Sequence, residues 1–153
     1  MNLIERLKGY DKAKLIIDNQ INSEFQTEFF DINGNYYAND FGDLVIYRNS
    51  QWVDFDSTDP KFELFSITDL EAEVMQYRRE HKIYEAGDKV VIAGNGSLFE
   101  VVITRSEYSD RYIALAIIFK NLARLKYADW YERDSVSHAT AAEIAAGKRL
   151  EVV

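Results

Sequence analysis

The sequence contains no cysteine, one proline and two histidines among its 153 residues. The absence of cysteine excludes disulfide bonds, thiolate metal ligands and a cysteine nucleophile, and it favours a reducing compartment such as the cytoplasm. No run of 18 apolar residues occurs, so we expect no transmembrane helix and no membrane association. Residues 1–7 have no apolar stretch after their charges, so we expect no secretory signal there.

Apolar residues make up 47% of the chain and aromatic residues 14%. This share is sufficient for a hydrophobic core and excludes global disorder. The length fits one domain or two small ones.

The net charge of −8 is concentrated in the first half of the chain. Residues 1–80 contain 16 acidic and 8 basic residues, whereas residues 81–153 contain 10 of each. Between Leu15 and Tyr77, Arg48 and Lys61 oppose 13 carboxylates. Such a field repels phosphate backbones, which argues against direct nucleic-acid binding by this half, and it attracts basic surfaces. Solubility is the alternative explanation of these charges.

The first half is expected to combine helices with an antiparallel sheet. Asn2 and Glu5 have capping-box spacing, and we expect helices within Asn2–Asn19, with Asp11 capping the second. Thr68 and Glu71 form another capping box, which predicts a helix over Asp69–Glu80. Tight turns are predicted at Asn33-Gly34 and Asn49-Ser50. The expected strands are Phe25–Phe30, Tyr36–Tyr37, Leu44–Arg48, Gln51–Phe55 and Phe62–Phe65.

The second half is expected to form a small curved sheet or an SH3-like barrel, followed by a short helix. Thr140 and Glu143 form a third capping box, and the helix should end near Gly147. The expected strands are Lys89–Ala93, Ser97–Thr104, Tyr112–Phe119, Leu122–Tyr127 and Asp129–Glu132. The fold class is therefore α+β, with an acidic helix-plus-sheet module over residues 1–82 and a β-barrel-like module over residues 83–153.

Residues suited to catalysis or metal binding are few. His81 and His138 are 57 residues apart, so we expect His81 at a helix end and His138 in a loop or cap rather than in a metal site. The segment Asp31–Asn35 is similar to a calcium loop, but its glycine is misplaced and a hairpin turn explains it better. We therefore predict no catalytic residue, no bound metal and no cofactor.

Basic and aromatic residues are interleaved in the second half, a mixture that suits nucleic-acid binding on a small barrel. With zero net charge in this half, core packing and solvated edges are the preferred explanation. The residues are Tyr108, Arg111, Tyr112, Lys120, Arg124, Lys126, Tyr127 and Trp130.

Three segments carry a family resemblance. They are Ile4-Glu5-Arg6-Leu7-x-Gly9-Tyr10-Asp11-Lys12-Ala13-Lys14, Tyr77-Arg78-Arg79-x6-Ala86-Gly87-Asp88-Lys89-Val90-Val91, and His138-Ala139-Thr140-x2-Glu143-Ile144-x2-Gly147-x-Arg149-Leu150. Together they resemble small, largely uncharacterised accessory proteins of tailed phages and prophages. Most relatives have a proline after the threonine, where this chain has Ala141. The resemblance implies a phage origin in a bacterial host cell and assigns no catalytic residues.

Three functional hypotheses follow. The first is a non-enzymatic phage accessory protein that binds a basic surface of a host protein and inhibits a host defence or nucleic-acid enzyme. Its candidate binding residues are Asp40, Asp43, Asp54, Asp56 and Asp59, which occupy expected turns or outward strand positions. The second is a nucleic-acid-associated phage protein that uses the second half. The third is a small enzyme with a carboxylate or metal site around Asp54, Asp56 and Asp59.

Overall fold

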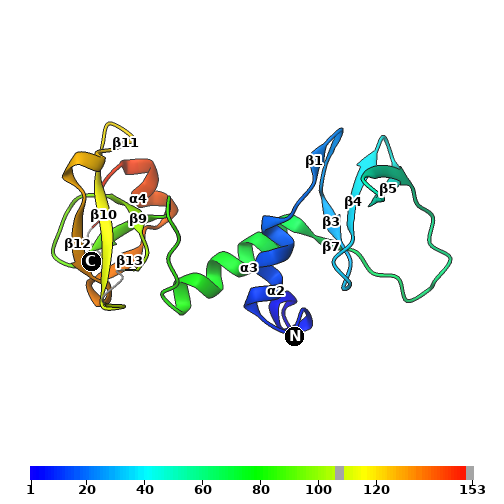
Figure 1. Cartoon of the computed structure of the whole chain (residues 1–153), viewed down its shortest axis with the longest axis horizontal. Coiled ribbons are helices and arrows are strands. Elements are labelled where there is room, and N and C mark those ends of the chain that lie inside the picture. The colour runs from blue at the N-terminus through cyan, green and yellow to red at the C-terminus, as the bar shows by residue number, and fades with distance from the viewer. Residues whose placement is uncertain (106–108, 151–153) are drawn as a thin grey trace. The chain divides into compact units, whose positions relative to one another are not determined.

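The computed structural model describes residues 1–105 and 109–150. The chain divides into two compact units, residues 1–77 and residues 78–153, each described here by itself. Both units combine helices with antiparallel strands, so the predicted α+β class is confirmed (Figure 1). The sequence placed the boundary after residue 82, whereas the structure places it after Tyr77, within helix α3 (Ile67–Glu80).

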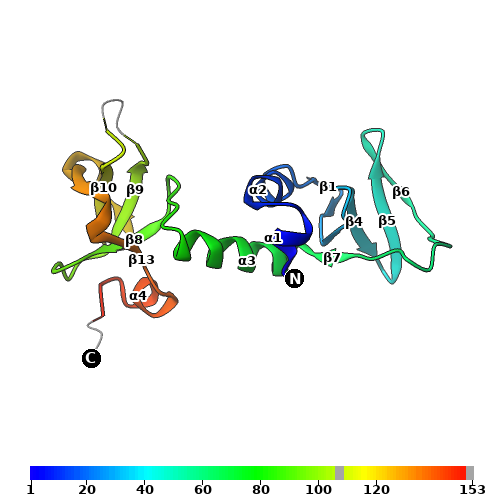
Figure 2. The ribbon, with the colours of Figure 1, turned by 90° about the horizontal axis from the view of Figure 1, so that it is seen from below.

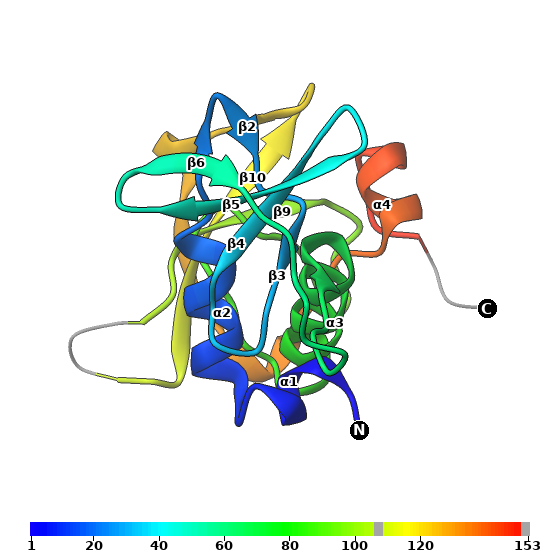
Figure 3. The same cartoon turned by 90° about the vertical axis from the view of Figure 1, so that its right-hand side faces the viewer.

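The first unit contains a five-stranded antiparallel sheet in the order β6-β5-β4-β3-β7 and a short β1–β2 hairpin. Figure 3 shows helix α2 beside the β3–β4 hairpin, where the Tyr36 hydroxyl donates to the Ile16 carbonyl at 2.7 Å. The elements that precede α3 are α1 (Leu3–Arg6), α2 (Tyr10–Asp18), β1 (Asn22–Ser23), β2 (Phe25–Gln26), β3 (Phe29–Phe30), β4 (Tyr36–Asp40), β5 (Asp43–Arg48), β6 (Gln51–Asp54) and β7 (Phe65–Ser66).

The helix starts agree with the sequence at α1 and differ at α2 and α3. The Asn2–Glu5 capping box is formed, with Glu5 N donating to Asn2 Oδ1 at 2.9 Å. Helix α2 is capped by Gly9, so Asp11 lies in its first turn and is not the cap. Helix α3 begins at Ile67, because Ser66 Oγ accepts from the amide of Asp69 at 3.3 Å. The predicted start at Asp69, with Thr68 as the cap, therefore lies two residues too late.

The predicted strand Phe25–Phe30 is divided into β2 and β3. Buried Thr27 lies between them, and its hydroxyl donates to the Ile21 carbonyl at 2.7 Å and accepts from the Ile21 amide at 3.0 Å. These bonds tie the chain back to residue 21 and interrupt strand pairing. A buried cluster then closes the unit around Phe30, with helix residues on one side: Ile4, Leu7, Ala13, Ile16, Ile67, Leu70 and Val74.

The second unit contains a six-stranded antiparallel sheet in the order β11-β10-β9-β8-β13, with β12 also paired to β10. Figure 2 shows α4 beside the β8 and β13 strands. No pairing among the described residues joins β13 to β11 or β12, so the sheet is not a closed barrel. The elements are β8 (Lys89–Ile92), β9 (Phe99–Ile103), β10 (Tyr112–Phe119), β11 (Leu122–Ala123), the 3₁₀ helix η1 (Leu125–Tyr127), β12 (Asp129–Glu132), the 3₁₀ helix η2 (Arg133–Ser135), β13 (Val136–His138) and α4 (Ala141–Ala146).

The longest predicted strand, Tyr112–Phe119, is confirmed as β10 despite its two alanines. The predicted strand Leu122–Tyr127 instead ends at Ala123 and continues as η1. The Thr140–Glu143 capping box is formed, and α4 ends at Gly147 in the left-handed region with φ of 68°. Tyr84, which precedes β8, and the inner face of the sheet form a buried core with Val90, Ile92, Phe99, Val101, Ile113, Leu115 and Val136.

Candidate functional site

Four of the five candidate acidic residues gather at one end of the first sheet. Asp40 lies directly opposite Asp43 in the β4–β5 pair, and Val45 lies opposite Asp54 in the β5–β6 pair. Because side chains alternate along a strand, Asp40, Asp43 and Asp54 share one face. The amide of Phe55 donates to the Leu44 carbonyl at 3.0 Å, which extends the pairing and brings Asp56 to the same end.

An exposed phenylalanine lies in the turn between Asp40 and Asp43. Phe41 and Gly42 form the two-residue β4–β5 turn, with φ of 49° and 100°. Phe41 is fully exposed to solvent, so its ring contributes nothing to a core. A bulky side chain at positive φ is a backbone outlier, and turns of this kind normally use Asn, Asp or Gly. We call residues Asp40, Phe41, Gly42, Asp43, Asp54 and Asp56 the acidic tip.

The charges of the acidic tip are not neutralised within the first unit. No lysine or arginine in the described part of the chain forms an ion pair with Asp40, Asp43, Asp54 or Asp56. Like charges directly opposite each other on paired strands are destabilising. The Asp40–Asp43 pair is therefore a local cost to the fold.

The fifth candidate, Asp59, lies apart in the chain segment between β6 and β7. Its carboxylate accepts from the amide of Lys61 at 2.9 Å and its carbonyl accepts from the amide of Phe62 at 3.1 Å, so it forms a turn. A structural role is sufficient for this residue, and the structure does not bring it to the acidic tip.

A carboxylate or metal site around Asp54, Asp56 and Asp59 finds no geometric support. No group of three or more potential metal ligands occurs among the described residues. Cavities of about 710, 450 and 300 Å³ are lined by other residues. The calcium-like segment is a hairpin turn, in which Asp31 accepts from the amides of Asn33 and Asn35 at 2.9 and 3.0 Å.

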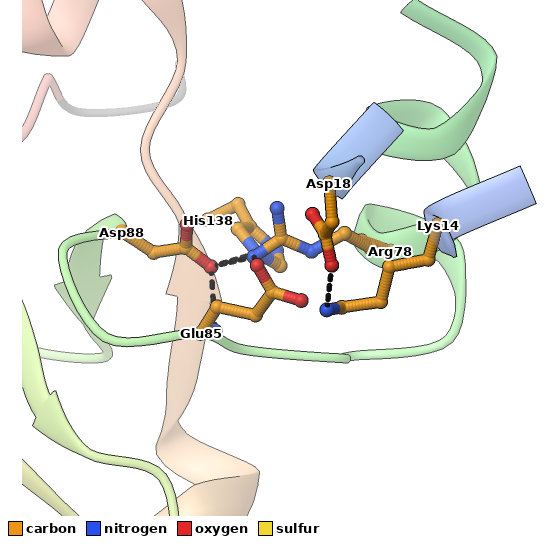
Figure 4. A network of polar contacts seen from close by, with 6 residues as sticks. All are labelled: Lys14, Asp18, Arg78, Glu85, Asp88 and His138. Carbon is orange, nitrogen blue, oxygen red and sulfur yellow. Dashed lines mark hydrogen bonds and ion pairs between the residues drawn. The ribbon is translucent and has the colours of Figure 1, made fainter. Parts of the chain in front are cut away.

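Buried polar residues of the second unit form a network around Asp88 (Figure 4). The Asp88 carboxylate pairs with Arg78 and accepts from the amide of Glu85 at 2.8 Å. Its Oδ2 atom lies 3.4 Å from Nε2 of His138, whose side chain is 2% exposed and stacks on Tyr84 at 4.6 Å. His138 ends β13 and is a buried packing residue, so its predicted loop or cap position was wrong.

The pKa values of the largely buried carboxyls of Asp88 and Glu143 lie below their ordinary range. Burial alone raises the pKa of Asp88, but the proximity of His138, the hydrogen bond from the amide of Glu85 and the charge of Arg78 outweigh burial and lower the pKa. The amide of Thr140 donates to Glu143 at 3.1 Å and is the main cause that lowers the pKa of that carboxyl. Both groups join separate segments, since Glu143 also accepts from the amide of Leu150 at 3.0 Å. Figure 4 also shows an ion pair at the surface of helix α2, where Lys14 Nζ lies 2.6 Å from Asp18 Oδ2.

The basic and aromatic residues of the second half include an ion-paired arginine and three residues that line a cavity. Arg111 pairs with Glu132 at 2.8 Å, which accounts for its charge, and Tyr108 lies outside the described residues. Arg124, Lys126 and Tyr127 line the cavity of about 710 Å³, together with Asn95, Phe99, Ile117, Phe119 and Tyr131. The cavity is thus a groove where β10, η1 and β12 meet.

Two aromatic residues with exposed rings, Phe41 and Phe119, were not identified as site residues from the sequence. The signal for Phe41 was the segment Asp40-Phe41-Gly42-Asp43, which places an aromatic residue in a tight turn between two strands. Phe119 is 57% exposed although it ends the most apolar strand, and periodicity alone does not distinguish this position from a core position.

Comparison with protein-family models, with curated proteins and with solved structures finds no match to this chain. Within residues 1–105 and 109–150, no helix has the length and apolar character needed to span a membrane.

Proposed function

We propose that the chain is a non-enzymatic protein-binding module that docks the acidic tip onto a basic surface of a host protein. The observation that carries this proposal is Phe41, which is fully exposed at positive φ between two opposed carboxylates. Neither the ring nor the charge pair benefits the isolated fold, so both are best explained by a partner.

The chemistry of the tip indicates the kind of surface that it fits. Exposed aromatic residues act as binding anchors when they enter an apolar pocket, and surrounding charges speed association and select the partner. The partner surface should therefore have an apolar pocket for Phe41, with lysine or arginine side chains around it to face Asp40, Asp43 and Asp54.

The explanation that these acids only keep the protein soluble accounts for fewer of the observations at the acidic tip. Carboxylates that only solubilise need no aromatic residue among them and no directly opposed pair. The resemblance to phage accessory proteins supports a host protein as the partner, and a host-defence or nucleic-acid enzyme has the basic surface required. The expected compartment is the bacterial cytoplasm.

The test begins with parallel affinity captures from bacterial lysate, using the wild-type chain and the Phe41→Asn variant as baits. A protein retained by the wild type and lost with the variant is then purified, and its affinity is measured at two salt concentrations. We expect Phe41→Asn to weaken binding about tenfold or more, as truncation of an aromatic anchor does. We expect Asp43→Lys to weaken it severalfold and to reduce its dependence on salt.

The matched control is the double variant Glu24→Lys/Asp134→Lys, in which both acids are exposed and lie outside the acidic tip. Compared with Asp43→Lys/Asp54→Lys, it changes the net charge equally. Equal loss of binding in both double variants would mean that the acids act only through the net charge of the protein. Binding that is indifferent to Phe41→Asn and to salt would refute the proposal.

A further inference from the structure

The groove of the second unit has features that the acidic tip does not explain. It has a volume of about 710 Å³ and lies next to the inner face of the open sheet. Phe99 and Ile117 at its base belong to the core or pack against it, whereas Phe119 and Tyr127 at its rim are 57% and 62% exposed. The groove therefore leads from a rigid core to two largely solvent-exposed aromatic rings.

Each exposed ring is accompanied by cations. Lys120 Nζ and the guanidinium carbon of Arg124 lie 5.6 and 5.8 Å from the centre of the Phe119 ring. Lys126 Nζ lies 4.9 Å from the centre of the Tyr127 ring. No carboxylate in the described part of the chain forms an ion pair with any of these three cations.

The segment that supplies Phe119, Arg124, Lys126 and Tyr127 to the groove contains no acidic residue, although Asp129 and Glu132 flank Tyr131. Residues 111–128 contain four basic residues and no acidic one. Lys120, Arg124 and Lys126 therefore form a local positive cluster in a half whose net charge is near zero. Lys120 and Asn121 form the β10–β11 turn at φ of 52° and 62°, which places the lysine at the end of the hairpin.

We propose that this groove binds single-stranded nucleic acid without sequence preference. Aromatic rings paired with cations suit such a strand, because every base offers a face for stacking and every nucleotide carries a phosphate. Duplex nucleic acid offers phosphates but no free base faces, so it makes only half of these contacts. An acidic peptide would satisfy the cations and leave both rings without a stacking partner. Binding should weaken as salt rises, because Lys120, Arg124 and Lys126 displace counterions from the phosphates. The negative charge of the first unit opposes binding, and salt screens that repulsion.

The test uses fluorescein-labelled oligothymidylate of about 15 nucleotides, a length that covers one small binding site. Fluorescence anisotropy is recorded with the full chain at about 50 and 150 mM salt. We expect binding at the lower salt, weaker binding to a duplex of equal length, and no effective competition by polyglutamate. Absence of binding at low salt, equal duplex binding, or displacement by polyglutamate at equal charge would overturn the proposal.

Variants separate stacking from simple charge attraction. Tyr127→Leu should weaken binding about fivefold or more, whereas Tyr127→Phe should preserve it, because only the ring is required. Lys120→Gln and Arg124→Gln should each lower the slope of log affinity against log salt by about 0.7. Lys61→Gln removes an exposed cation of the first unit and is the matched control, expected to leave the slope unchanged.

Circular dichroism of each variant excludes unfolding as the cause of any loss. Equal affinity of Tyr127→Leu and Tyr127→Phe, or an unchanged slope in Lys120→Gln and Arg124→Gln, would contradict the stacking groove. Phe41→Asn should bind oligothymidylate like the wild type, so the outcome here is independent of the acidic tip.

Discussion

At the scale of single residues, some side chains are unfavourable for the backbone conformation that they occupy. Phe41 is the clearest, because the left-handed region disfavours a side chain of its size by about 1 kcal/mol or more. Asn is the residue that two-residue hairpins prefer at this position. A role in partner binding would explain why phenylalanine occupies this position.

Replacing Phe41 with Asn should therefore stabilise the protein. We expect the free energy of unfolding to rise by about 1 kcal/mol, because the new residue tolerates positive φ and no core contact is lost. Urea denaturation followed by Trp52 fluorescence in the Trp130→Phe background measures this change. A loss of stability would mean that the Phe41 ring packs in solution and would remove the argument for an anchor.

The lowered pKa of Asp88 predicts how the free energy of unfolding changes at acidic pH. Its pKa is lowered in the folded protein, so the carboxylate stabilises the fold above the ordinary aspartate pKa of about 3.9. This contribution is lost as the pH falls through the lower, folded value. Asp88→Asn should cost about 3 kcal/mol at neutral pH, because Arg78 loses its buried partner.

The same variant should flatten the acid side of the stability profile. Urea denaturation at several pH values from about 6 to 2 gives the slope, which reports protons taken up on unfolding. Asp134→Asn, at an exposed aspartate of the same unit, should keep the wild-type slope. If Asp88→Asn keeps that slope as well, Asp88 is not the group that governs acid stability.

At the scale of elements, the β3–β4 hairpin shows how one carboxylate organises a turn. Asp31 accepts from the amides of Asn33 and Asn35, from the Asn35 side chain at 2.8 Å and from the Tyr37 hydroxyl at 2.8 Å. Burial and the bond to Asp31 both raise the pKa of Tyr37 above its ordinary value. The turn is thus fixed by a side chain as much as by Gly34.

Asp31→Ala should therefore destabilise the protein by about 2–4 kcal/mol, because several donors lose a charged acceptor at once. Hydrogen exchange should show the largest loss of protection at the amides of Asn33 and Asn35. Asp59→Ala is the control at another turn, where one exposed amide loses its side-chain partner, and it should cost much less. Equal costs for the two variants would contradict the organising role of Asp31.

Several elements with a local signal were predictable from the sequence, although Asp11 and Thr68 did not cap their helices as predicted. Strand β13, which is defined by a distant partner, was not predicted. The Asn2 and Thr140 capping boxes and the Asn49-Ser50 turn act within a few residues, and all three form. Strand β13 is defined by its pairing with β8, more than 40 residues earlier, and has no local signal. For the same reason, the burial of His138 against Tyr84 and Asp88 was not predictable.

The candidate sites follow the same rule. The acidic residues were identified by charge, but their meeting at one end depends on the register of β4, β5 and β6. The groove depends on β10, η1 and β12 approaching one another, although its basic and aromatic residues were recognised. Exposure is the property that sequence conveys least, which is why Phe41 and Phe119 were missed.

At the scale of the whole molecule, charge is divided between the two units. Residues 1–77 contain 15 acidic and 6 basic residues, whereas residues 78–153 contain 11 acidic and 12 basic residues. The net charge of −8 therefore describes neither unit. A division of this kind allows one chain to present an acidic surface to one partner and a basic groove to another.

The cores are divided in the same way. Each core cluster in the described residues draws its members from one unit, with Leu70 fully buried in the first and Leu115 in the second. The chain has two tryptophans, and each unit contains one, Trp52 or Trp130. Trp52 packs against Phe25 and Tyr47, and Trp130 lies opposite Ala114 in the β10–β12 pair. Each tryptophan therefore reports the unfolding of its own unit.

This arrangement predicts that a core cavity in one unit lowers the stability of that unit alone. Leu70→Ala, in a chain that also carries Trp130→Phe, should lower the free energy of unfolding reported by Trp52 by about 2–5 kcal/mol. In the Trp52→Phe background the same variant should leave the Trp130 transition unchanged. Leu115→Ala should show the reverse pattern. Urea denaturation of the four proteins decides the question, because two cores that unfold as one cooperative body would shift both transitions together.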